Sequence, residues 1–271
     1  MPGQVQLSND EQTTLLSSRF PQRDEPNYAW GNVCSFYNAL TALRAFWPCG
    51  PQIATTQSLL ITDTADNFHL SAINAPVWGY ESLIPYVDFN GNNQYGFYAD
   101  NAQFDILGNE AYNAQPGLTL GCWIYPDRVT GTREYLLSKW DEAIPLSSAY
   151  RIMRGVGGNT SFAISTGAAS PGVSSTSLVR QSIWQFVAGR FVSGATLDVY
   201  LSTDIGTLEK TSAATAVAAM QNSAYNFTMA SDRVPANYLD GKISLAFVCA
   251  SALSDTIINA LYQLSRPLFG Q

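Results

Sequence analysis

The sequence predicts an all-β fold of two packed antiparallel sheets, with a short C-terminal helix and a partly helical N-terminal arm. From about Leu43 onward, short runs of β-branched and aromatic residues recur at intervals of roughly 8–15 residues, separated by Gly, Pro, Asn and Asp. Apolar and polar residues alternate within the clearest runs. No helical pattern lies between the runs, which excludes a parallel α/β fold. We therefore predict a sandwich domain over residues 42–271.

The preceding arm, residues 1–41, differs in character from the rest of the chain. Ser8 and Glu11 have the spacing of a capping box, which predicts a short helix near residues 9–18. A second short helix is predicted from four residues at helical spacing: Val33, Phe36, Tyr37 and Leu40. Because the arm is rich in aromatic residues, we expect it to pack, either on its own domain or on a partner.

Twelve runs are predicted as strands from their composition and from the turn residues that bound them. They are residues 43–47, 59–63, 86–91, 95–99, 118–126, 134–140, 150–155, 161–166, 182–192, 196–203, 225–231 and 242–250. In the run 118–126, the even-numbered positions up to 124 are Leu, Leu, Cys and Ile, whereas Trp123 and Tyr125 stand on the opposite face. Such two-faced strands suit two sheets packed face to face. We interpret Trp123 and Trp184 as core side chains.

A change of period near the C-terminus predicts one helix. Ser254 and Asp255 can cap it, and Pro267 ends it. Its apolar side is formed by Ile257, Ile258, Leu261, Tyr262 and Leu264. We expect this helix to cover an edge or an end of the sandwich.

Charge and composition exclude several classes of function. The chain carries 14 Lys+Arg and 21 Asp+Glu, a formal net charge of −7, and only 13% of its residues are charged. Nucleic acids and anionic membrane surfaces require clustered Lys and Arg, so we predict no nucleic-acid partner. No stretch is long and apolar enough for a membrane-spanning helix, and no secretory signal is visible at Met1. Cys122 and Cys249 lie in apolar runs and are expected to be buried and reduced.

Several motifs, each weak alone, occur in an order that resembles a known family. They lie at residues 86–91, 94–95, 118–126, 135–141, 183–189, 197–201, 239–247 and 252–257. Together they resemble LamG-like domains of the concanavalin A-like lectin/glucanase group. The resemblance implies a two-sheet antiparallel jelly roll. The chain departs from the family pattern where Gln185 and Phe186 replace the usual histidines, and where Ser244 and Leu245 replace an acidic pair.

The resemblance also raises the question of calcium. Members of the family often bind a structural calcium ion near a loop that corresponds to residues 63–67. Asp63, Asp66 and Asn67 could supply some of the six to eight oxygen ligands that Ca²⁺ takes. The alternative is a turn rich in Asp and Asn that holds no metal.

Because the group includes glucanases, an enzyme has to be considered. In that branch the catalytic carboxylates lie on one strand in the pattern E-x-D-x-x-E, and no such triplet occurs in this sequence. Glu134, Asp141 and Glu142 lie near a predicted turn, and we interpret them as solvated surface residues. We therefore predict that the protein is not an enzyme.

A glycan-binding role remains open for this chain. Sugar sites combine an exposed aromatic ring with Asn, Asp and Gly from loops, and this sequence is rich in all of them. The candidate ligand-binding residues are Tyr80, Tyr95, Tyr98, Tyr225 and Tyr238. The alternative for each is an aromatic residue at the rim that packs or simply faces solvent. A lectin or adhesin module of this kind would act outside the cell.

The preferred hypothesis is a structural component of a phage or virus-like particle, such as a capsid decoration, tail or fibre protein. The aromatic arm and the uncharged polar surface point this way, and parts of the sequence also resemble LamG-type domains carried by phage structural proteins. In this interpretation residues 1–41 attach to other virion proteins or form a homo-oligomer. The sandwich then faces outward on a virion assembled in the host cytoplasm, and cell-surface glycan is its second expected partner.

Overall fold

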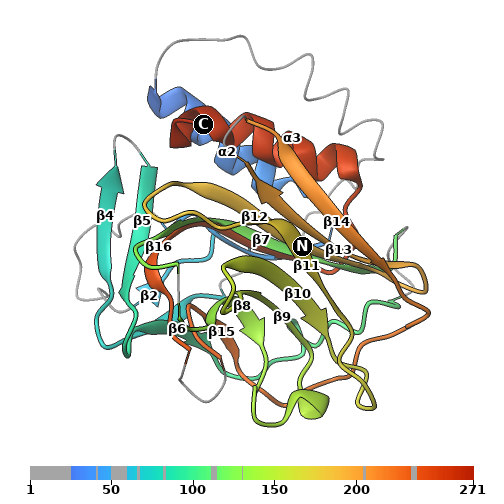
Figure 1. The fold of residues 1–271 in the computed structure, drawn as a ribbon. Coiled ribbons are helices and arrows are strands. Elements are labelled where there is room, and N and C mark those ends of the chain that lie inside the picture. The colour runs from blue at the N-terminus through green and yellow to red at the C-terminus, as the bar shows by residue number, and fades with distance from the viewer. Residues whose placement is uncertain are drawn as a thin grey trace, which may run out of the picture.

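The computed structural model describes residues 26–40, 42–49, 60–65, 68–81, 84–110, 115–129, 131–203, 206–232 and 237–271. These residues form two eight-stranded sheets and two α-helices (Figure 1). The strand pairs within both sheets are antiparallel. The predicted two-sheet sandwich is therefore confirmed.

The first sheet, here sheet A, has the long central strands of the domain. Its order is β14 (Leu208–Ala214), β13 (Thr196–Ser202), β12 (Gln185–Val192), β7 (Gly117–Pro126), β16 (Asp240–Cys249), β5 (Ile84–Asn90) and β4 (Val77–Glu81). A further strand, β1 (Leu43–Trp47), pairs with β16. Strands β7 and β16 run side by side over most of their length, apart from an irregularity between Ser244 and Phe247.

The second sheet, sheet B, packs against the inner face of sheet A. Its order is β11 (Gly172–Leu178), β10 (Asn159–Ile164), β9 (Tyr150–Arg154), β8 (Glu134–Lys139), β15 (Phe227–Met229), β6 (Tyr95–Tyr98), β3 (Leu70–Ile73) and β2 (Leu60–Ile61). A 3₁₀ helix, η1 (Pro145–Ser147), lies in the connection between β8 and β9.

The space between the sheets is filled by inward side chains. Those that carry the core include Leu118, Leu120, Cys122, Ile124, Leu137, Ile152, Phe162 and Phe227. Each such buried side chain contributes about 1.5–3 kcal/mol relative to exposure. Cys122 and Cys249 are free and buried, as predicted. Burial raises the pKa of both thiols, so neither provides a reactive thiolate at neutral pH.

The outer face of sheet A forms a second apolar core. Trp123 points outward from β7, and its ring stacks 4.1 Å from the ring of Phe269 and 5.9 Å from that of Tyr262. Its indole N–H donates a hydrogen bond to Ser265 Oγ at 2.8 Å. Trp184 is also buried, 4.9 Å from Phe269. Both tryptophans are core residues, as predicted, but they lie beneath helices and not between the sheets.

Helix α2 (Pro26–Asn38) is one cover of this outer face. It confirms the predicted helix around Val33 and Tyr37 and packs on the sandwich (Figure 1). The Tyr37 ring stacks 4.8 Å from Phe46 and meets Phe247 edge-on at 5.4 Å. Residues 30–40 of the arm therefore pack on their own domain. The predicted helix near residues 9–18 lies outside the described residues, and the boundary between residues 41 and 42 stays a prediction.

Helix α3 (Asp255–Ser265) is the other cover, and the 3₁₀ helix η2 (Arg266–Phe269) follows it. Its N-cap is Ser254, whose side chain accepts a hydrogen bond from the Ile257 N–H, as predicted. The expected position was wrong, because α3 lies across the face of sheet A and not at an edge or end (Figure 1). The outward aromatic residues of β7 and β12 require this cover. No helix in the described ranges has the length and apolar character of a membrane span.

Replacing Tyr37 tests whether α2 is part of the folded domain. Tyr37 is fully buried (0% exposed), so Tyr37→Ala should lower the free energy of unfolding by about 3–5 kcal/mol in urea denaturation. The same change at Tyr80, which is 59% exposed, should alter it by less than about 0.5 kcal/mol. If Tyr37→Ala lowered the free energy of unfolding as little as Tyr80→Ala does, α2 would not contribute to the core.

Candidate functional site

Two loops rich in asparagine are locked together at one end of the sandwich. The connection from β3 to β4 includes Asn74 and Ala75, and the connection from β5 to β6 includes Gln94. Gln94 Nε2 donates to the carbonyl oxygens of Asn74 at 3.1 Å and Ala75 at 2.9 Å. Asn74 Nδ2 in turn donates to the carbonyl oxygen of Asn93 at 2.7 Å. These bonds fix both loops without using charged groups.

The loop between β5 and β6 is shaped by Asn90 and Gly91. Asn90 Oδ1 accepts hydrogen bonds from the N–H groups of Asn92 at 3.1 Å and Asn93 at 3.2 Å, which is an Asx turn. Gly91 has a φ of 65°, and a Cβ there would lie 2.6 Å from Asp240 Cβ, so the position requires glycine. The turn leaves the side chains of Asn92 and Asn93 exposed.

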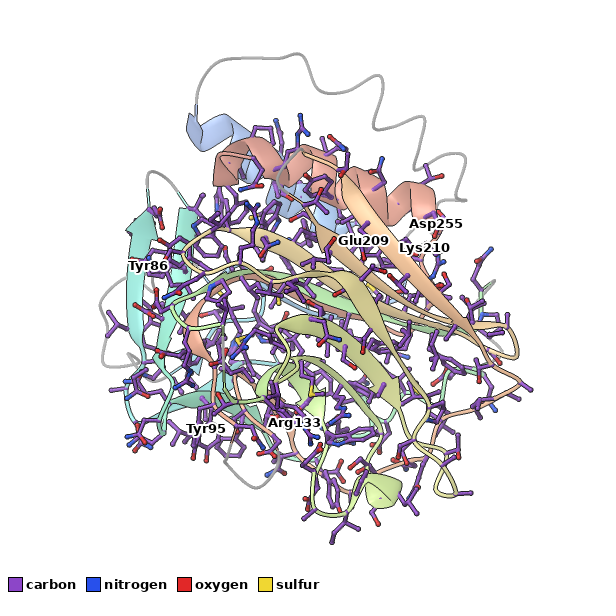
Figure 2. The ribbon with its side chains drawn as sticks, in the orientation of Figure 1. Tyr86, Tyr95, Arg133, Glu209, Lys210 and Asp255 are labelled. Carbon is purple, nitrogen blue, oxygen red and sulfur yellow. The ribbon has the colours of Figure 1, made fainter. Side chains whose placement is uncertain are left out.

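Tyr95 and Tyr238 lie beside this loop and face each other. Tyr95 points away from the core, because its neighbour Gly96 points inward, where a Cβ would lie 2.9 Å from Ile61 Cδ1. The ring centroids of Tyr95 and Tyr238 are 6.1 Å apart, with 44° between the planes. Tyr95 lies on the side of the sandwich away from α2 and α3 (Figure 2).

We call Tyr95, Tyr238, Asn74, Asn92 and Asn93 the tyrosine rim. Its side chains are all uncharged at neutral pH. Burial, together with the neighbouring Tyr95 and Asp232, raises the pKa of Tyr238 above its ordinary value, so the phenol keeps its proton. The tyrosine rim therefore presents two rings, phenol hydroxyls and carboxamides to solvent.

The five tyrosines predicted as ligand-binding residues do not share one surface. The structure brings Tyr95 and Tyr238 together. Tyr98 points inward and contacts Phe68 and Phe104, with ring centroids 5.5 Å and 5.8 Å apart. The other two lie elsewhere: Tyr80 is exposed on edge strand β4, and Tyr225 is half-buried before β15. Their part in binding stays a prediction.

The predicted calcium ligands are represented in the described residues by Asp63. Its carboxylate accepts hydrogen bonds from the N–H groups of Phe46 at 2.7 Å, Ala65 at 3.0 Å and Phe68 at 2.9 Å. These bonds use most of the acceptor sites that a cation would need, so Asp63 fits the metal-free turn. Asp66 and Asn67 lie outside the described residues. Within the described part of the chain, no group of three or more His, Cys, Asp or Glu side chains is arranged to hold a metal.

The interpretation as solvated surface residues was wrong for Glu134 and Asp141, whereas Glu142 is partly exposed. Glu134 is fully buried (0% exposed) and accepts a hydrogen bond from Arg154 Nε at 3.0 Å. Asp141 is also buried, and Glu142 forms an ion pair with Arg151. The reason is that arginines from β9 reach Glu134 and Glu142, whereas the backbone N–H of Ala143 donates to Asp141, and a buried carboxylate requires such partners. The sequence contains no local signal for pairing across strands.

A second aromatic surface, which sequence analysis missed, lies on the outer face of sheet A. Lys242 Nζ is 4.3 Å from the ring centroid of Tyr125 and 4.7 Å from that of Tyr86. Glu81 holds the ammonium group at 3.4 Å and also accepts a hydrogen bond from the indole N–H of Trp184. Because the lysine already covers these rings through cation–π contacts, they offer less stacking surface than the tyrosine rim.

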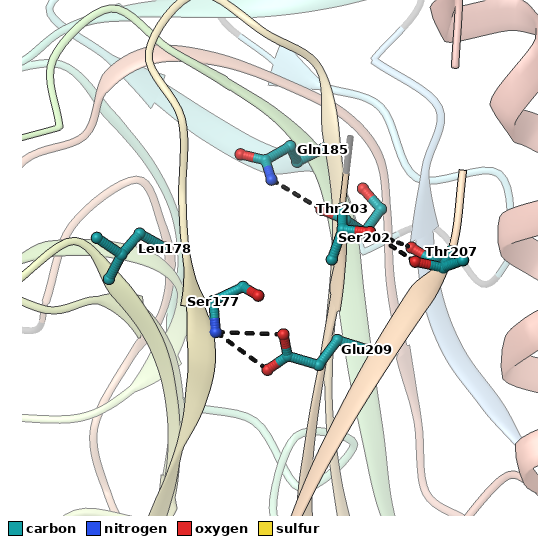
Figure 3. Close-up of a pocket in the computed structure, with 7 residues that line it drawn as sticks. All are labelled: Ser177, Leu178, Gln185, Ser202, Thr203, Thr207 and Glu209. Atoms are coloured by element: carbon teal, nitrogen blue, oxygen red, sulfur yellow. Dashed lines mark hydrogen bonds between the residues drawn. The ribbon is translucent and has the colours of Figure 1, made fainter. Parts of the chain in front are cut away.

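A hollow of about 520 Å³ lies where edge strand β11 of sheet B meets edge strand β14 of sheet A (Figure 3). It is lined by Ser177, Leu178, Gln185, Ser202, Thr203, Thr207 and Glu209. The carboxylate of Glu209 accepts hydrogen bonds from the backbone N–H groups of Thr176 at 2.7 Å and Ser177 at 3.2 Å. Glu209 thereby joins the edges of the two sheets.

This contact predicts a pH dependence of stability. Burial alone would raise the pKa of Glu209, but hydrogen bonds from Ser177 and Thr176 hold it below its ordinary value of 4.5. A lowered folded-state pKa means that the ionised carboxylate stabilises the fold above about pH 4.5 and loses this effect as the pH falls below it. Glu209→Gln should therefore lower Tm at about pH 6 and have little effect at about pH 3. An equal difference in Tm between the unsubstituted protein and Glu209→Gln at both pH values would contradict the stabilising role of the ionised carboxylate.

Known proteins share both sequence features and the fold of this chain. The model of the family described as Concanavalin A-like lectin/glucanases superfamily matches residues 90–259, more than half of the chain. The receptor-binding domain of botulinum neurotoxin C/D mosaic serotype is similar in structure, with a TM-score of 0.58 and 11% identity over 82% of this chain and 51% of that chain. Comparison with curated proteins gives no match.

A second similar structure is domain 4 of AbnA, an extracellular arabinanase from Geobacillus stearothermophilus, in complex with arabinotriose. Its TM-score is 0.57, with 15% identity over 82% of this chain and 98% of that domain. This chain spans about half the length of the toxin domains it matches but nearly all of the arabinanase domain. The structural matches show the shared fold. Together with the family match, they confirm the resemblance found in the motifs: the chain belongs to the concanavalin A-like lectin/glucanases superfamily and forms a lectin-like jelly roll.

Proposed function

We propose that this protein is a non-enzymatic glycan-binding domain and that its ligand contacts the tyrosine rim. The observation that carries the proposal is the pairing of Tyr95 and Tyr238. Although distant in sequence, their rings lie 6.1 Å apart beside the exposed side chains of Asn92 and Asn93. The fold alone would not support a ligand, since folds of this kind serve several functions.

The chemistry of the tyrosine rim matches that of a neutral oligosaccharide. A sugar ring has an apolar C–H face, which packs on aromatic rings, and an edge of hydroxyl groups that need both donors and acceptors. The carboxamides of Asn92 and Asn93 and the phenols of Tyr95 and Tyr238 provide both. Domain 4 of AbnA, which has a similar fold, is known in complex with arabinotriose. This likeness supports a saccharide as the ligand class.

The non-enzymatic part of the proposal is supported by the state of the carboxylates. Glycoside hydrolysis needs two of them on either side of the scissile bond, one as acid and the other as nucleophile or base. Glu134 and Glu142 are instead engaged by Arg154 and Arg151.

Substitution at the tyrosine rim tests the proposal. Glycan arrays and calorimetry with arabinotriose and other neutral oligosaccharides should identify a ligand, and Tyr95→Ala or Tyr238→Ala should weaken its binding by about tenfold or more. The loss is expected because each substitution removes a ring from the contact surface. Tyr80 is the matched control: it was a candidate from the sequence, but it lies on edge strand β4, and the proposal for the tyrosine rim requires that Tyr80→Ala leave binding unchanged.

Two outcomes would contradict this proposal. Binding that survives both rim substitutions, or that is lost in Tyr80→Ala, would place the ligand elsewhere. Release of reducing sugar from a bound glycan would contradict the non-enzymatic part.

We also propose that the domain is a virion component that is attached through the segment before α2. The positions of α2 and Tyr95 support this proposal. Helix α2 packs on sheet A, whereas Tyr95 faces the opposite side of the sandwich (Figures 1 and 2). Attachment on the helix side would leave the tyrosine rim directed outward, toward a cell-surface glycan. The aromatic content of residues 1–41 and the low charge of the chain also favour a role in a larger assembly.

Deletion of residues 1–25 tests attachment without removing α2. The truncated protein should keep its thermal unfolding profile, because α2 and its contacts remain. It should lose association with virions in co-sedimentation, or lose its oligomeric state in analytical ultracentrifugation. Unchanged assembly of a folded truncated protein would overturn the proposal.

A further inference from the structure

We infer that the hollow between β11 and β14 is a second ligand site, and that it takes a single neutral sugar residue or a small polyol. It differs from the tyrosine rim in position and in chemistry, because it has walls and contains no aromatic ring among the residues that line it (Figure 3). Its volume of about 520 Å³ lies within the range of about 300–1,000 Å³ found for small-molecule sites.

The walls of the hollow come from both sheets. Ser177 and Leu178 lie on β11 at the edge of sheet B, whereas Thr207 and Glu209 lie on β14 and the residues before it at the edge of sheet A. Gln185, at the start of β12, forms the inner end. Glu209 and its neighbour Lys210 point to opposite faces of β14, since Lys210 Nζ contacts Asp255 at 3.0 Å. The lysine is therefore directed away from the hollow.

The polarity of the described lining residues excludes most other ligand classes. Apart from Leu178, the described lining consists of hydroxyl groups, one carboxamide and one carboxylate, with no Lys, Arg or His. The low pKa of Glu209 keeps its carboxylate ionised at neutral pH, so the hollow repels anions. The Glu209 carboxylate already accepts hydrogen bonds from the backbone N–H groups of Thr176 and Ser177, which leaves it few acceptor sites for a divalent cation. A neutral ligand with several hydroxyl groups fits this lining best.

The lining keeps hydrogen-bonding capacity for such a ligand. Gln185 Nε2 donates one of its two hydrogens to the carbonyl oxygen of Ser202 at 2.8 Å, which leaves the second hydrogen. The hydroxyl groups of Thr203 and Thr207 are paired at 2.6 Å, and the Thr203 hydroxyl also lies 3.5 Å from the carbonyl oxygen of Thr207, so these hydroxyl oxygens mainly offer acceptor lone pairs to a ligand. The Gln185 amide is fixed by the Arg180 N–H, which donates to its Oε1 at 2.7 Å. The polar groups are thus held in place before a ligand arrives.

Leu178 completes the site with an apolar wall. Its side chain is 57% exposed although it is a leucine on a strand, and it lines the hollow. Burial of apolar surface by a ligand is favourable by about 25 cal/mol per Å². The C–H groups of a sugar or polyol can cover this side chain while its hydroxyl groups bond to the polar walls.

The proposal is tested by titration of the full-length protein with arabinose, glycerol and glucuronate, followed by amide chemical shifts. Arabinose or glycerol should shift the amide signals of Ser177 and Glu209, and glucuronate should bind more weakly because Glu209 repels it. Thr207→Val removes one hydroxyl group and should weaken arabinose binding about three- to tenfold. Thr176→Val is the control, since Thr176 lies on the same strand but does not line the hollow.

A second pair of variants tests the apolar wall. Leu178→Ser should weaken arabinose binding. Ile144→Ser is the control: Ile144 is similarly exposed (50%) but does not line the hollow. Leu178 pairs with the first residue of β10, whereas Ser165, just after the last residue of β10, bonds to Leu146 in the segment of Ile144. Tyr95→Ala should leave these shifts unchanged, so failure of this site can be told apart from failure of the tyrosine rim. The inference is overturned if neither neutral compound shifts β11 and β14, or if the shifts persist equally in Thr207→Val and Leu178→Ser.

Discussion

The stacking of Trp123 on Phe269 and Tyr262 determines which side of the sandwich remains open. Strand β7 carries apolar side chains on both faces, since Leu120 and Cys122 enter the inter-sheet core while Trp123 points outward. An aromatic residue on the outer face requires cover, because its burial contributes kilocalories of stability. Helices α2 and α3 supply that cover. Large ligands are therefore left with the surfaces that the helices do not cover, namely the tyrosine rim, the β11–β14 hollow and the rings of Tyr86 and Tyr125, which Lys242 already covers.

Many charged side chains are paired inside the fold and do not reach the open surfaces. Several of the few charged residues form internal pairs: Lys139 is fully buried beside Asp100, Glu134 meets Arg154, and Arg190 bonds to Asp198. Such pairs are weak contributors to net stability, although loss of one partner is costly. The consequence for function is a set of open surfaces made of carboxamide, hydroxyl and phenol groups. These groups recognise neutral hydroxylated ligands better than ions.

The sequence predicted nearly all interior strands but missed three of the edge strands. Each of the twelve predicted runs overlaps a strand, because long runs of β-branched and aromatic residues report burial in a sheet. The missed strands are β3, β4, β11 and β14. Strands β11 and β14 are dominated by Ser, Thr, Ala and charged residues, and β4 contains Gly79, so their pattern is that of loops. The hollow opens between two of these missed edge strands, β11 and β14, so its position could not be foreseen.

The candidate site was predicted in part. Aromatic residues near Asn-rich turns can be picked from the sequence, which is how Tyr95 and Tyr238 were found. Their pairing depends on the hydrogen bond from the Gly91 N–H to the carbonyl oxygen of Leu239, which brings distant segments together. No local pattern reports such a contact. The same limit explains why Lys242 over Tyr86 and Tyr125 was missed, and why Tyr98 could not be recognised as inward-facing.

The most direct test of this account is a crystal structure of the protein with the neutral oligosaccharide that binds it most tightly. We expect the sugar to contact the rings of Tyr95 and Tyr238 and the carboxamides of Asn92 or Asn93, on the side away from α2 and α3. A sugar seated against the two helices, or on the rings of Tyr86 and Tyr125, would contradict the account.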